Sequence, residues 1–356
     1  MSQLRTVQVL GGGAGSSAHV SSLAAGLIAR GVQVTVCAPA GAGRAHGLPA
    51  TGARFVAVPR RSDPAAVAAL RTACTGADIV HAHGLHAAVR ARIALSGRGV
   101  PLVVTWHTRT HADGARGRLL RLLERRAARA AAVVLGTSWE LVDRARRRGA
   151  RDARLAPAAI PASRFAYAPD EGKARAELGA VGRPLLVSVA QHDHGTLLDA
   201  ARGWRALDPV PLLAVAGEGP RTGALRRRIA AEGLPVVLTG ADGIGELLAA
   251  ADVAVLSGRG EGGPLLAQEA LRLGVPLVAA RADGVPELVG EAAELVPYGD
   301  ADALAGAVVR LLGDPGRRER LADSGRAQAA GWPTEDDTVA HVLSVYDELA
   351  QQVTVY

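Results

Sequence analysis

The stretch that decides the fold is Val253-Ala254-Val255-Leu256, followed after a short turn by Glu261-Gly262-Gly263-Pro264-Leu265-Leu266-Ala267-Gln268-Glu269. The apolar residues 253–256 predict a buried strand, and the run from Pro264 predicts a helix, because proline is well tolerated in a first helical turn. Gly262 and Gly263 let the backbone approach a ligand, and the unpaired N–H groups of a helix start attract an anion. We therefore expect a strand, an anion-binding turn and a helix.

Glu261 and Glu269 lie on either side of this turn, and Glu269 is expected about one turn inside the helix. A carboxylate accepts hydrogen bonds from sugar or ribose hydroxyls, while backbone amides suit a phosphate. These features predict a site for a nucleotide-linked sugar. The competing interpretation is that both glutamates are solvated surface residues.

Short apolar strands alternate with helical stretches, which is typical of a parallel sheet covered by helices on both faces. Helices are predicted at 19–30, 64–74 and 117–130. The predicted strands are 7–10, 33–37, 55–58, 79–81, 102–106 and 133–135 in the first half, and 185–189, 212–216, 236–238, 253–256 and 277–280 in the second. The fold class is therefore α/β, with two Rossmann-like domains facing each other across a cleft, and ligands are expected at the carboxyl ends of the strands.

Strand signals are thin between residues 157 and 182, where Pro161 and Pro169 lie, and we place the domain boundary near residue 168. The predicted domains are 1–168 and 169–331. A separate helical pattern, 332–356, follows them. Its apolar residues recur at helical spacing: Val339, Val342, Leu343, Tyr346 and Leu349.

Composition indicates a soluble enzyme of two domains, since 356 residues exceed what one hydrophobic core usually supports and 49% of them are apolar. The net charge of +7 favours contact with anions. Cys37 and Cys74 are too few for a disulfide framework. The N-terminus carries no apolar signal region and no apolar run is long enough for a membrane span, so we expect a cytoplasmic protein.

A glycine loop, residues 11–15, follows the first strand, and the amides of Gly12 and Gly13 are candidates for holding a phosphate. A dinucleotide-dependent dehydrogenase also places an acidic residue after the second strand. The chain has Cys37-Ala38-Pro39 there, which argues against NAD.

Histidines are concentrated in the first half, at 81, 83, 86, 107 and 111. His107 ends the strand 102–106, and histidine titrates near neutral pH, so His107 is a candidate general base. A hydrogen-bonded structural histidine is the alternative. His81, His83 and His107 also form a possible metal cluster, but no cysteine or acidic ligand lies at a familiar spacing, and we expect no metal.

These residues resemble those of the GT-B glycosyltransferases of the large retaining group often called family 4. The resemblance covers nearly the whole chain and is most specific at 261–289, where a Glu-x7-Glu motif precedes Gly274-Val275-Pro276 and a Gly-x-Pro-Glu turn. That turn has Asp283 where the family usually has another glycine. Gly217-Glu218-Gly219-Pro220 and Gly299-Asp300 match as well.

The resemblance implies a transferase that moves a sugar from a nucleotide-sugar donor to an acceptor hydroxyl with retention of configuration. Glu269 would hold the donor ribose. Glu261, which would hold the donor sugar, and His107, which would serve as the base, would be the catalytic residues. The helix from Trp332 would cross back onto the first domain. The remaining donor-binding residues would be Gly12, Gly13, Gln191, Gly217, Glu218, Gly262, Gly263, Pro264, Leu265 and Leu266, and the acceptor side would include His19, His81 and His83. The nucleotide sugar is a co-substrate, and no cofactor is expected.

One departure from the family affects catalysis. Relatives carry an arginine and then a lysine after the first strand of the second domain, and both grip the donor diphosphate. Here the segment reads Gln191-His192-Asp193-His194-Gly195. Losing such a donor of hydrogen bonds commonly costs several kcal/mol of transition-state stabilisation.

The segment 109–154 holds thirteen arginines against five acidic residues. Leucines 119, 120, 122 and 123 lie among these arginines, so this segment is a candidate for docking on an anionic membrane at its inner face. The alternative is a solvated arginine-rich helix. Nucleic-acid binding is not expected, because aromatic residues for stacking are few. The acceptor is not specified by the sequence and is either lipid-linked or a small molecule.

Three functions therefore remain open. The first is an active retaining glycosyltransferase of the hexosyltransferase type. The second is a weakened or non-catalytic relative that binds a sugar or nucleotide, as the Gln191 segment suggests. The third is a sugar-nucleotide epimerase with the GT-B fold, which needs additional acids facing the donor ring.

Overall fold

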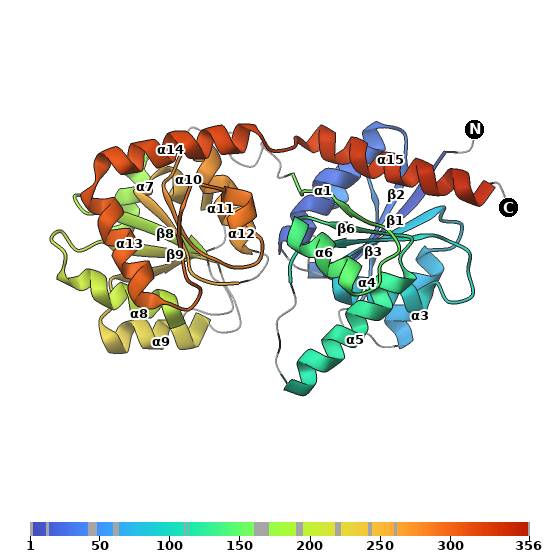
Figure 1. The fold of residues 1–356 in the computed structure, drawn as a ribbon, viewed down its shortest axis with the longest axis horizontal. Helices are drawn as coiled ribbons and strands as arrows, with labels where there is room; N and C mark the ends of the chain where they lie inside the picture. Colours follow the sequence, from blue (N-terminus) through green and yellow to red (C-terminus); the bar gives the residue numbers. More distant parts are fainter. Residues whose placement is uncertain are drawn as a thin grey trace. The chain divides into compact units, whose positions relative to one another are not determined.

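The computed structural model describes residues 3–11, 14–41, 48–59, 64–109, 112, 114–159, 171–189, 195–217, 222–240, 244–259 and 262–354. The chain divides into two compact units, one made of Met1–Pro161 with Pro333–Tyr356 and the other of Ala162–Trp332. The predicted boundary near residue 168 lies outside the described residues. The last helix of the chain belongs to the first unit (Figure 1).

The first unit is built on a parallel sheet of seven strands in the order β3-β2-β1-β4-β5-β6-β7. The strands are β1 (Arg5–Leu10), β2 (Gln33–Ala38), β3 (Arg54–Ala57), β4 (Ile79–His83), β5 (Leu102–Trp106), β6 (Val133–Gly136) and β7 (Ala153–Leu155). The strand order reverses direction between β1 and β4, and ligands of such sheets bind at the carboxyl ends of the strands beside that switch.

Helices cover both faces of this sheet. They are α1 (Ala14–Ala29), the 3₁₀ turn η1 (Leu48–Thr51), α3 (Pro64–Ala73), α4 (Leu85–Ala94), α5 (Gly114–Ala130), α6 (Trp139–Arg147) and α15 (Glu335–Thr354). One core joins the sheet to α3, α4, α5 and α6, and the other joins it to α1 and α15. Figure 1 shows α15 running along the face that also carries α1.

The second unit repeats this plan with six parallel strands in the order β10-β9-β8-β11-β12-β13. The strands are β8 (Leu185–Val189), β9 (Leu212–Ala216), β10 (Val236–Thr239), β11 (Val253–Leu256), β12 (Leu277–Ala280) and β13 (Glu294–Val296). Here the strand order reverses between β8 and β11, which pair through Val253↔Leu186 and Ala254↔Val187.

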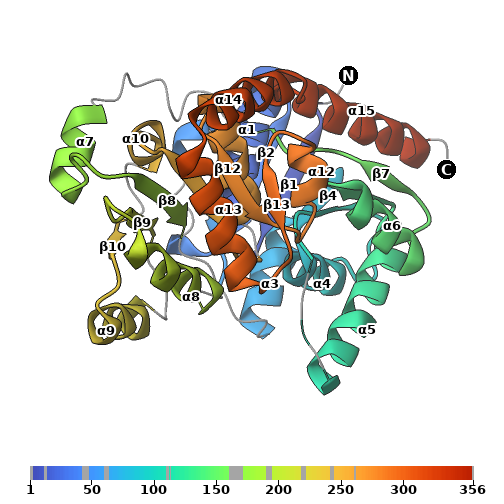
Figure 2. The same ribbon diagram turned by 60° about the vertical axis from the view of Figure 1, so that its left-hand side comes forward.

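The helices of the second unit also form two layers. They are α7 (Glu171–Leu178), α8 (Gly195–Gly203), the 3₁₀ turn η3 (Trp204–Ala206), α9 (Thr222–Glu232), α10 (Ile244–Ala249), α11 (Gly262–Leu273), α12 (Val285–Val289), α13 (Ala301–Gly313) and α14 (Pro315–Ala330). One core contains α10, α11 and α12, and the other contains α8 and α13. Figure 2 shows α13 lying over β12 and β13.

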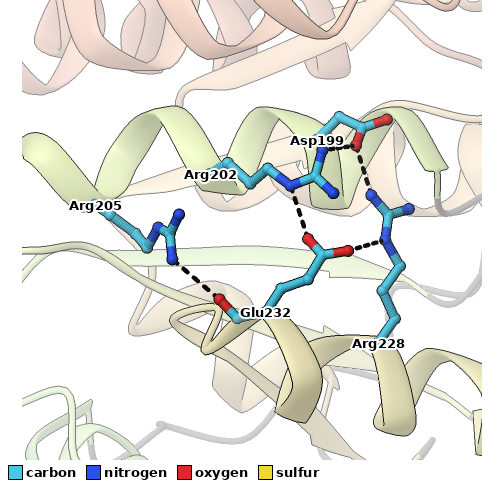
Figure 3. Close-up of polar contacts among 5 residues, drawn as sticks. All are labelled: Asp199, Arg202, Arg205, Arg228 and Glu232. Atoms are coloured by element: carbon cyan, nitrogen blue, oxygen red, sulfur yellow. Dashed lines mark hydrogen bonds and ion pairs between the residues drawn. The ribbon is translucent and has the colours of Figure 1, made fainter.

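An ion-pair network joins α8 to α9 on the surface of this unit (Figure 3). The carboxylate of Glu232 accepts hydrogen bonds from Arg202 at 2.7 Å and from Arg228 at 2.8 Å. These two hydrogen bonds lower the pKa of Glu232 to about 2. Asp199 accepts from the same two arginines, so the four charges alternate in sign.

The structure corrects several predicted boundaries. Helix α1 begins at Ala14 rather than at His19, and α15 begins at Glu335 rather than at Trp332. Trp332 packs against the core of the second unit. The strands β7 and β13 were not predicted.

Candidate functional site

Four histidines gather where the sheet of the first unit changes direction. His81 and His83 lie on β4, His19 on α1, and His107 directly after β5. His81, His83 and His19 are buried, with 0%, 1% and 5% of their surface exposed, while His107 is half-buried. His107 is therefore the member of this histidine cluster that a ligand reaches most directly.

The register of the parallel strands brings the polar residues of this cluster together. Gln8 of β1 pairs with His81 of β4, and His83 of β4 pairs with Thr105 of β5. Because alternate residues of a strand point to the same face, His81 and His83 share one side of the sheet. That side is the one covered by α1 and α15, so the cluster is enclosed between strands and helices.

Hydrogen bonds connect the cluster to the C-terminal helix. The hydroxyl of Tyr346, a fully buried residue of α15, lies 2.6 Å from Nδ1 of His81 and accepts from the amide of Gln8 at 2.9 Å. His81 Nε2 lies 2.6 Å from the hydroxyl of Thr105. The sequence predicted Tyr346 as an apolar core residue of the last helix. The structure shows in addition that its hydroxyl makes hydrogen bonds.

Further contacts extend this network to His107. His83 Nε2 lies 2.9 Å from the amide oxygen of Gln8, and His83 Nδ1 lies 3.2 Å from His107 Nε2. The ring centroids of His19 and His107 are 5.2 Å apart. The main-chain carbonyl of His107 accepts a hydrogen bond from the hydroxyl of Thr137 at 3.2 Å, which fixes the end of β5.

Burial keeps these histidines neutral. Removal from water lowers the pKa of His19 to about 4 and the pKa of His81 to about 3. The pKa values of His83 and His107 also lie well below the ordinary value, first because of burial and then because of neighbouring histidines. A neutral imidazole has one N–H and one lone pair, so each ring can act as a base or as a ligand.

Among the described residues, His19, His83 and His107 form a group whose ligand atoms all lie within 4.8 Å of one another. Imidazole nitrogens are common ligands of zinc and related ions. The triad differs from the predicted one, since His19 takes the place of His81, whose two nitrogens face Tyr346 and Thr105. The absence of a metal stays a prediction.

The predicted donor segment of the second unit forms the strand β11 and the helix α11. Glu269 is 5% exposed, Leu266 is 2% exposed, and Pro264 and Leu265 are half-buried in the first turns of α11. The interpretation of Glu269 as a solvated surface residue is therefore wrong. A buried carboxylate is costly unless it is paired or hydrogen-bonded, and such residues are concentrated at functional sites.

Three further segments that match the family motifs have a defined backbone geometry. Asp283, at the position where relatives usually carry glycine, has φ of 50°, and Gly284 follows with φ of 77°. Aspartate tolerates this left-handed region better than most residues. Asp300 caps α13 by accepting from the N–H of Ala303 at 2.8 Å. Gly217, with φ of 106°, directly follows β9 and donates its N–H to the carbonyls of Thr239 and Gly240.

Several predicted site residues lie outside the described residues: Gly12, Gly13, Gln191, Glu218 and Glu261. Gly262 and Gly263 form the first residues of α11. The structure brings His19, His81, His83 and His107 together in the first unit. In the second unit Gly217 directly follows β9, whereas Glu269 lies about two turns inside α11, deeper than the single turn that was predicted.

Arg90 is a buried residue at the carboxyl end of β1 that the sequence analysis did not single out. It is 2% exposed on α4 and donates to the carbonyls of Leu10 at 2.8 Å and Pro59 at 3.0 Å. These bonds hold the carboxyl end of β1. An arginine inside an alanine-rich helix was the available signal, and the abundance of arginine in this chain obscured it.

Comparisons with known proteins agree with this architecture. Residues 14–161 match the model of the glycosyl transferase 4-like domain, and residues 176–314 match the model of glycosyl transferases group 1. No curated protein matches the sequence.

Solved structures share the fold over nearly the full length. Anabaena HepE in complex with UDP and glucose superimposes with a TM-score of 0.79 at 19% identity, covering 95% of this chain and 99% of that one. A glycosyltransferase from Rickettsia africae has a TM-score of 0.77 at 14% identity and covers 98% and 99%. A putative UDP-N-acetylglucosamine 2-epimerase from Listeria monocytogenes reaches 0.68 at 13% identity and covers 96% and 95%.

At these low sequence identities the solved structures establish only the fold, and the assignment to a family rests on the two family models. Together the models cover most of the chain, and each lies within one of the two units. The chain belongs to the group 1 glycosyltransferases with the GT-B fold.

Proposed function

We propose that this protein transfers a hexose from a nucleotide-sugar donor to an acceptor hydroxyl with retention of anomeric configuration. The observation that carries the proposal is the buried Glu269 on α11, directly after the strand at which the second sheet changes direction. Such a switch point is where α/β sheets bind their ligands. Anabaena HepE, which shares this fold, was crystallised with UDP and glucose, and this supports a nucleotide-sugar donor.

In this proposal the second unit binds the donor. Glu269 accepts hydrogen bonds from the ribose, and the backbone at the start of α11 faces the diphosphate and sugar, because helix N-termini attract anions. Glu261 holds the donor sugar. The amides of Gly12 and Gly13 in the first unit contribute to anion binding.

His107 is the proposed base on the acceptor side. It is half-buried at the end of β5, and its low pKa leaves the ring neutral, with one lone pair available for an acceptor proton. The rings of His19 and His83 contact the ring of His107, and His81 stacks on His83 in turn. No metal is required for these roles.

A second candidate function is binding without catalysis, and the Gln191 segment favours it, because the arginine and lysine that relatives use for the diphosphate are missing from the sequence there. Turnover separates the two. An active transferase releases free nucleotide from the donor when an acceptor is present, while a binding protein raises its melting temperature with the donor and releases none.

The turnover experiment screens UDP-, GDP- and ADP-sugars for thermal stabilisation and then follows nucleotide release and the product by NMR. The proposal expects a glycoside whose anomeric configuration equals that of the donor. A glycoside of opposite configuration refutes retention. A product that is still nucleotide-linked identifies the epimerase activity instead.

We also propose that the protein acts at the cytoplasmic face of an anionic membrane through α5. Glu124, the helix's one acidic residue, is buried and pairs with Arg144 and Arg148. Leu119 and Leu122 are 55% and 44% exposed. They lie on α5 among exposed arginines, namely Arg116, Arg118, Arg121, Arg125, Arg126 and Arg129. In both ribbon views one end of α5 extends beyond the rest of its unit (Figures 1 and 2).

This surface combines positive charge with exposed leucine, which suits an interfacial position. Among the described residues no helix is long and apolar enough to cross a bilayer. Each arginine near an anionic surface contributes about 1 kcal/mol.

The docking is tested by sedimentation with phosphatidylglycerol vesicles. Reversing the charge of Arg118 and Arg125 to glutamate should weaken binding by at least about tenfold. The same reversal at Arg226 and Arg227, exposed on α9, is the matched control and should leave binding unchanged. Equal loss in both variants, or no binding by the unaltered protein, contradicts the membrane proposal.

A further inference from the structure

The buried hydrogen-bond network of the first unit runs from the C-terminal helix to the proposed base. In order, it joins Thr105, His81, Tyr346, Gln8, His83 and His107, through contacts of 2.6, 2.6, 2.9, 2.9 and 3.2 Å. We propose that Tyr346 and Gln8 are positioning residues that fix the tautomer of His107, with the hydrogen on Nε2 and the lone pair on Nδ1. This inference rests on the proposed function only where it concerns catalysis.

Gln8 sets the direction of the network. Its side-chain oxygen only accepts and its nitrogen only donates. The oxygen lies 2.9 Å from His83 Nε2, so that nitrogen must carry a hydrogen. The nitrogen lies 2.9 Å from the hydroxyl of Tyr346 and donates to it.

The tautomer of His107 follows from that of His83. Burial lowers the pKa of His83, so the ring is neutral, and a hydrogen on Nε2 leaves Nδ1 with a lone pair. His83 Nδ1 lies 3.2 Å from His107 Nε2, so His107 Nε2 must be the donor. His107 is also neutral, which leaves its lone pair on Nδ1.

The other half of the network is satisfied in the same direction. The oxygen of Tyr346 already accepts from Gln8, and its own hydrogen goes to Nδ1 of His81. His81 then donates from Nε2 to the hydroxyl of Thr105. Each donor of the network meets an acceptor, which is what a buried polar network requires.

Rotation of the Gln8 amide by half a turn reverses this order. The amide nitrogen then donates to His83 Nε2, His83 donates from Nδ1 to His107 Nε2, and the lone pair of His107 moves to Nε2. In the observed orientation the hydroxyl of Tyr346 serves as acceptor for the amide nitrogen. The orientation of the Gln8 amide, which lies between Tyr346 of the last helix and His83, therefore sets which nitrogen of His107 carries the lone pair, a detail that orients catalytic and ligand histidines generally.

The tautomers are measured directly by long-range ¹H–¹⁵N correlation of the imidazole rings at pH 7, with a chelator present. Ring signals are assigned by their loss in His83→Gln and His107→Gln. We expect His83 and His107 of the unaltered protein to be protonated at Nε2 and bare at Nδ1. A bare Nε2 on His107 overturns the proposal, and so does a metal-ligand signal at that atom.

Tyr346→Phe removes the acceptor while keeping the ring. We expect the Nδ1 and Nε2 signals of His83 and His107 to move towards each other as both orientations of Gln8 become populated. Val342→Ala, a buried apolar change on the same helix, is the control that lowers stability without changing the tautomers. Unchanged tautomers in Tyr346→Phe, or an equal shift in Val342→Ala, overturns the proposal.

Kinetics separate this inference from the proposed function. If the two tautomers become equally populated, the kcat of Tyr346→Phe should fall roughly twofold while the KM for the nucleotide sugar stays unchanged. If the spectra change as expected but His107→Gln transfers sugar at the normal rate, the base assignment fails and the tautomer assignment stands.

Discussion

Lowering the pH from 7.5 to 6.0 should destabilise the first unit and leave the second unit nearly unchanged. His19, His81, His83 and His107 are neutral in the folded protein, with the pKa of His19 lowered to about 4 and that of His81 to about 3. In the unfolded chain each titrates near its ordinary value of 6.5. The unfolded state therefore binds more protons, and stability falls as the pH falls through this window.

The magnitude follows from the linkage relation. At pH 6.0 a histidine that titrates at 6.5 when unfolded, and not at all when folded, costs about 0.8 kcal/mol of stability. Four such residues give about 3 kcal/mol as an upper value. The loss continues below pH 6.0 and levels off only near the folded pKa values.

Urea unfolding at pH 7.5, 6.5 and 6.0, monitored by hydrogen exchange of peptides from β4 and β8, measures the stability of the two units separately. The protection of β4 should drop as the pH falls, and the protection of β8 should not. Before α15, the second half of the sequence contains only two histidines, His192 and His194. If the hydrogen-exchange protection of β4 does not change between pH 7.5 and pH 6.0, this would falsify the claim that the histidines are held neutral by burial.

Three substitutions test individual contacts and one backbone turn in the two units. Gly26→Ala places a Cβ 2.5 Å from Val339 Cγ2 and should destabilise the packing of α15 on α1 by about 1–3 kcal/mol. Gly306→Ala on α13 is the control and should not be destabilising. Equal urea midpoints in the two variants contradict this expectation. Glu124→Gln leaves Arg144 and Arg148 without their buried carboxylate and should cost about 2–4 kcal/mol in urea unfolding, and a cost below 1 kcal/mol means that the pairs are solvated. Asp283→Gly relieves a φ of 50° and should change stability by less than about 1 kcal/mol, while Asp283→Val should destabilise clearly by calorimetry; a Val variant as stable as the Gly variant contradicts the assigned backbone.

The sequence predicted most of the fold because the central strands are continuous apolar runs. β5 and β11 were placed correctly from such runs alone. The edge strands β7 and β13 escaped prediction, since each has three residues and includes a charged one, Arg154 or Glu294. The start of α1 was missed because its first residues, Ala14-Gly15-Ser16-Ser17, are typical of loops.

Individual residues of the candidate site were predicted from the sequence, but the contacts between them were not. His107 was recognised as a strand-end histidine and His83 as an acceptor-side candidate, but their hydrogen bond depends on the register of β4 and β5. Tyr346 fits the apolar stripe of α15, and the sequence gives no sign that its hydroxyl reaches a residue 338 positions earlier. Gln8 inside an apolar strand was the available signal for a buried polar network.

The measurement that tests the central claim most directly is calorimetry of Glu269→Gln and Glu269→Ala with the nucleotide sugar that stabilises the protein best. Hydrogen bonds from ribose hydroxyls to a carboxylate contribute about 1.5–3 kcal/mol, so the Kd should rise by roughly tenfold to a hundredfold. Glu291→Ala, an exposed carboxylate of the same unit, is the control and should bind normally. An unchanged Kd in folded Glu269 variants contradicts the donor site on α11.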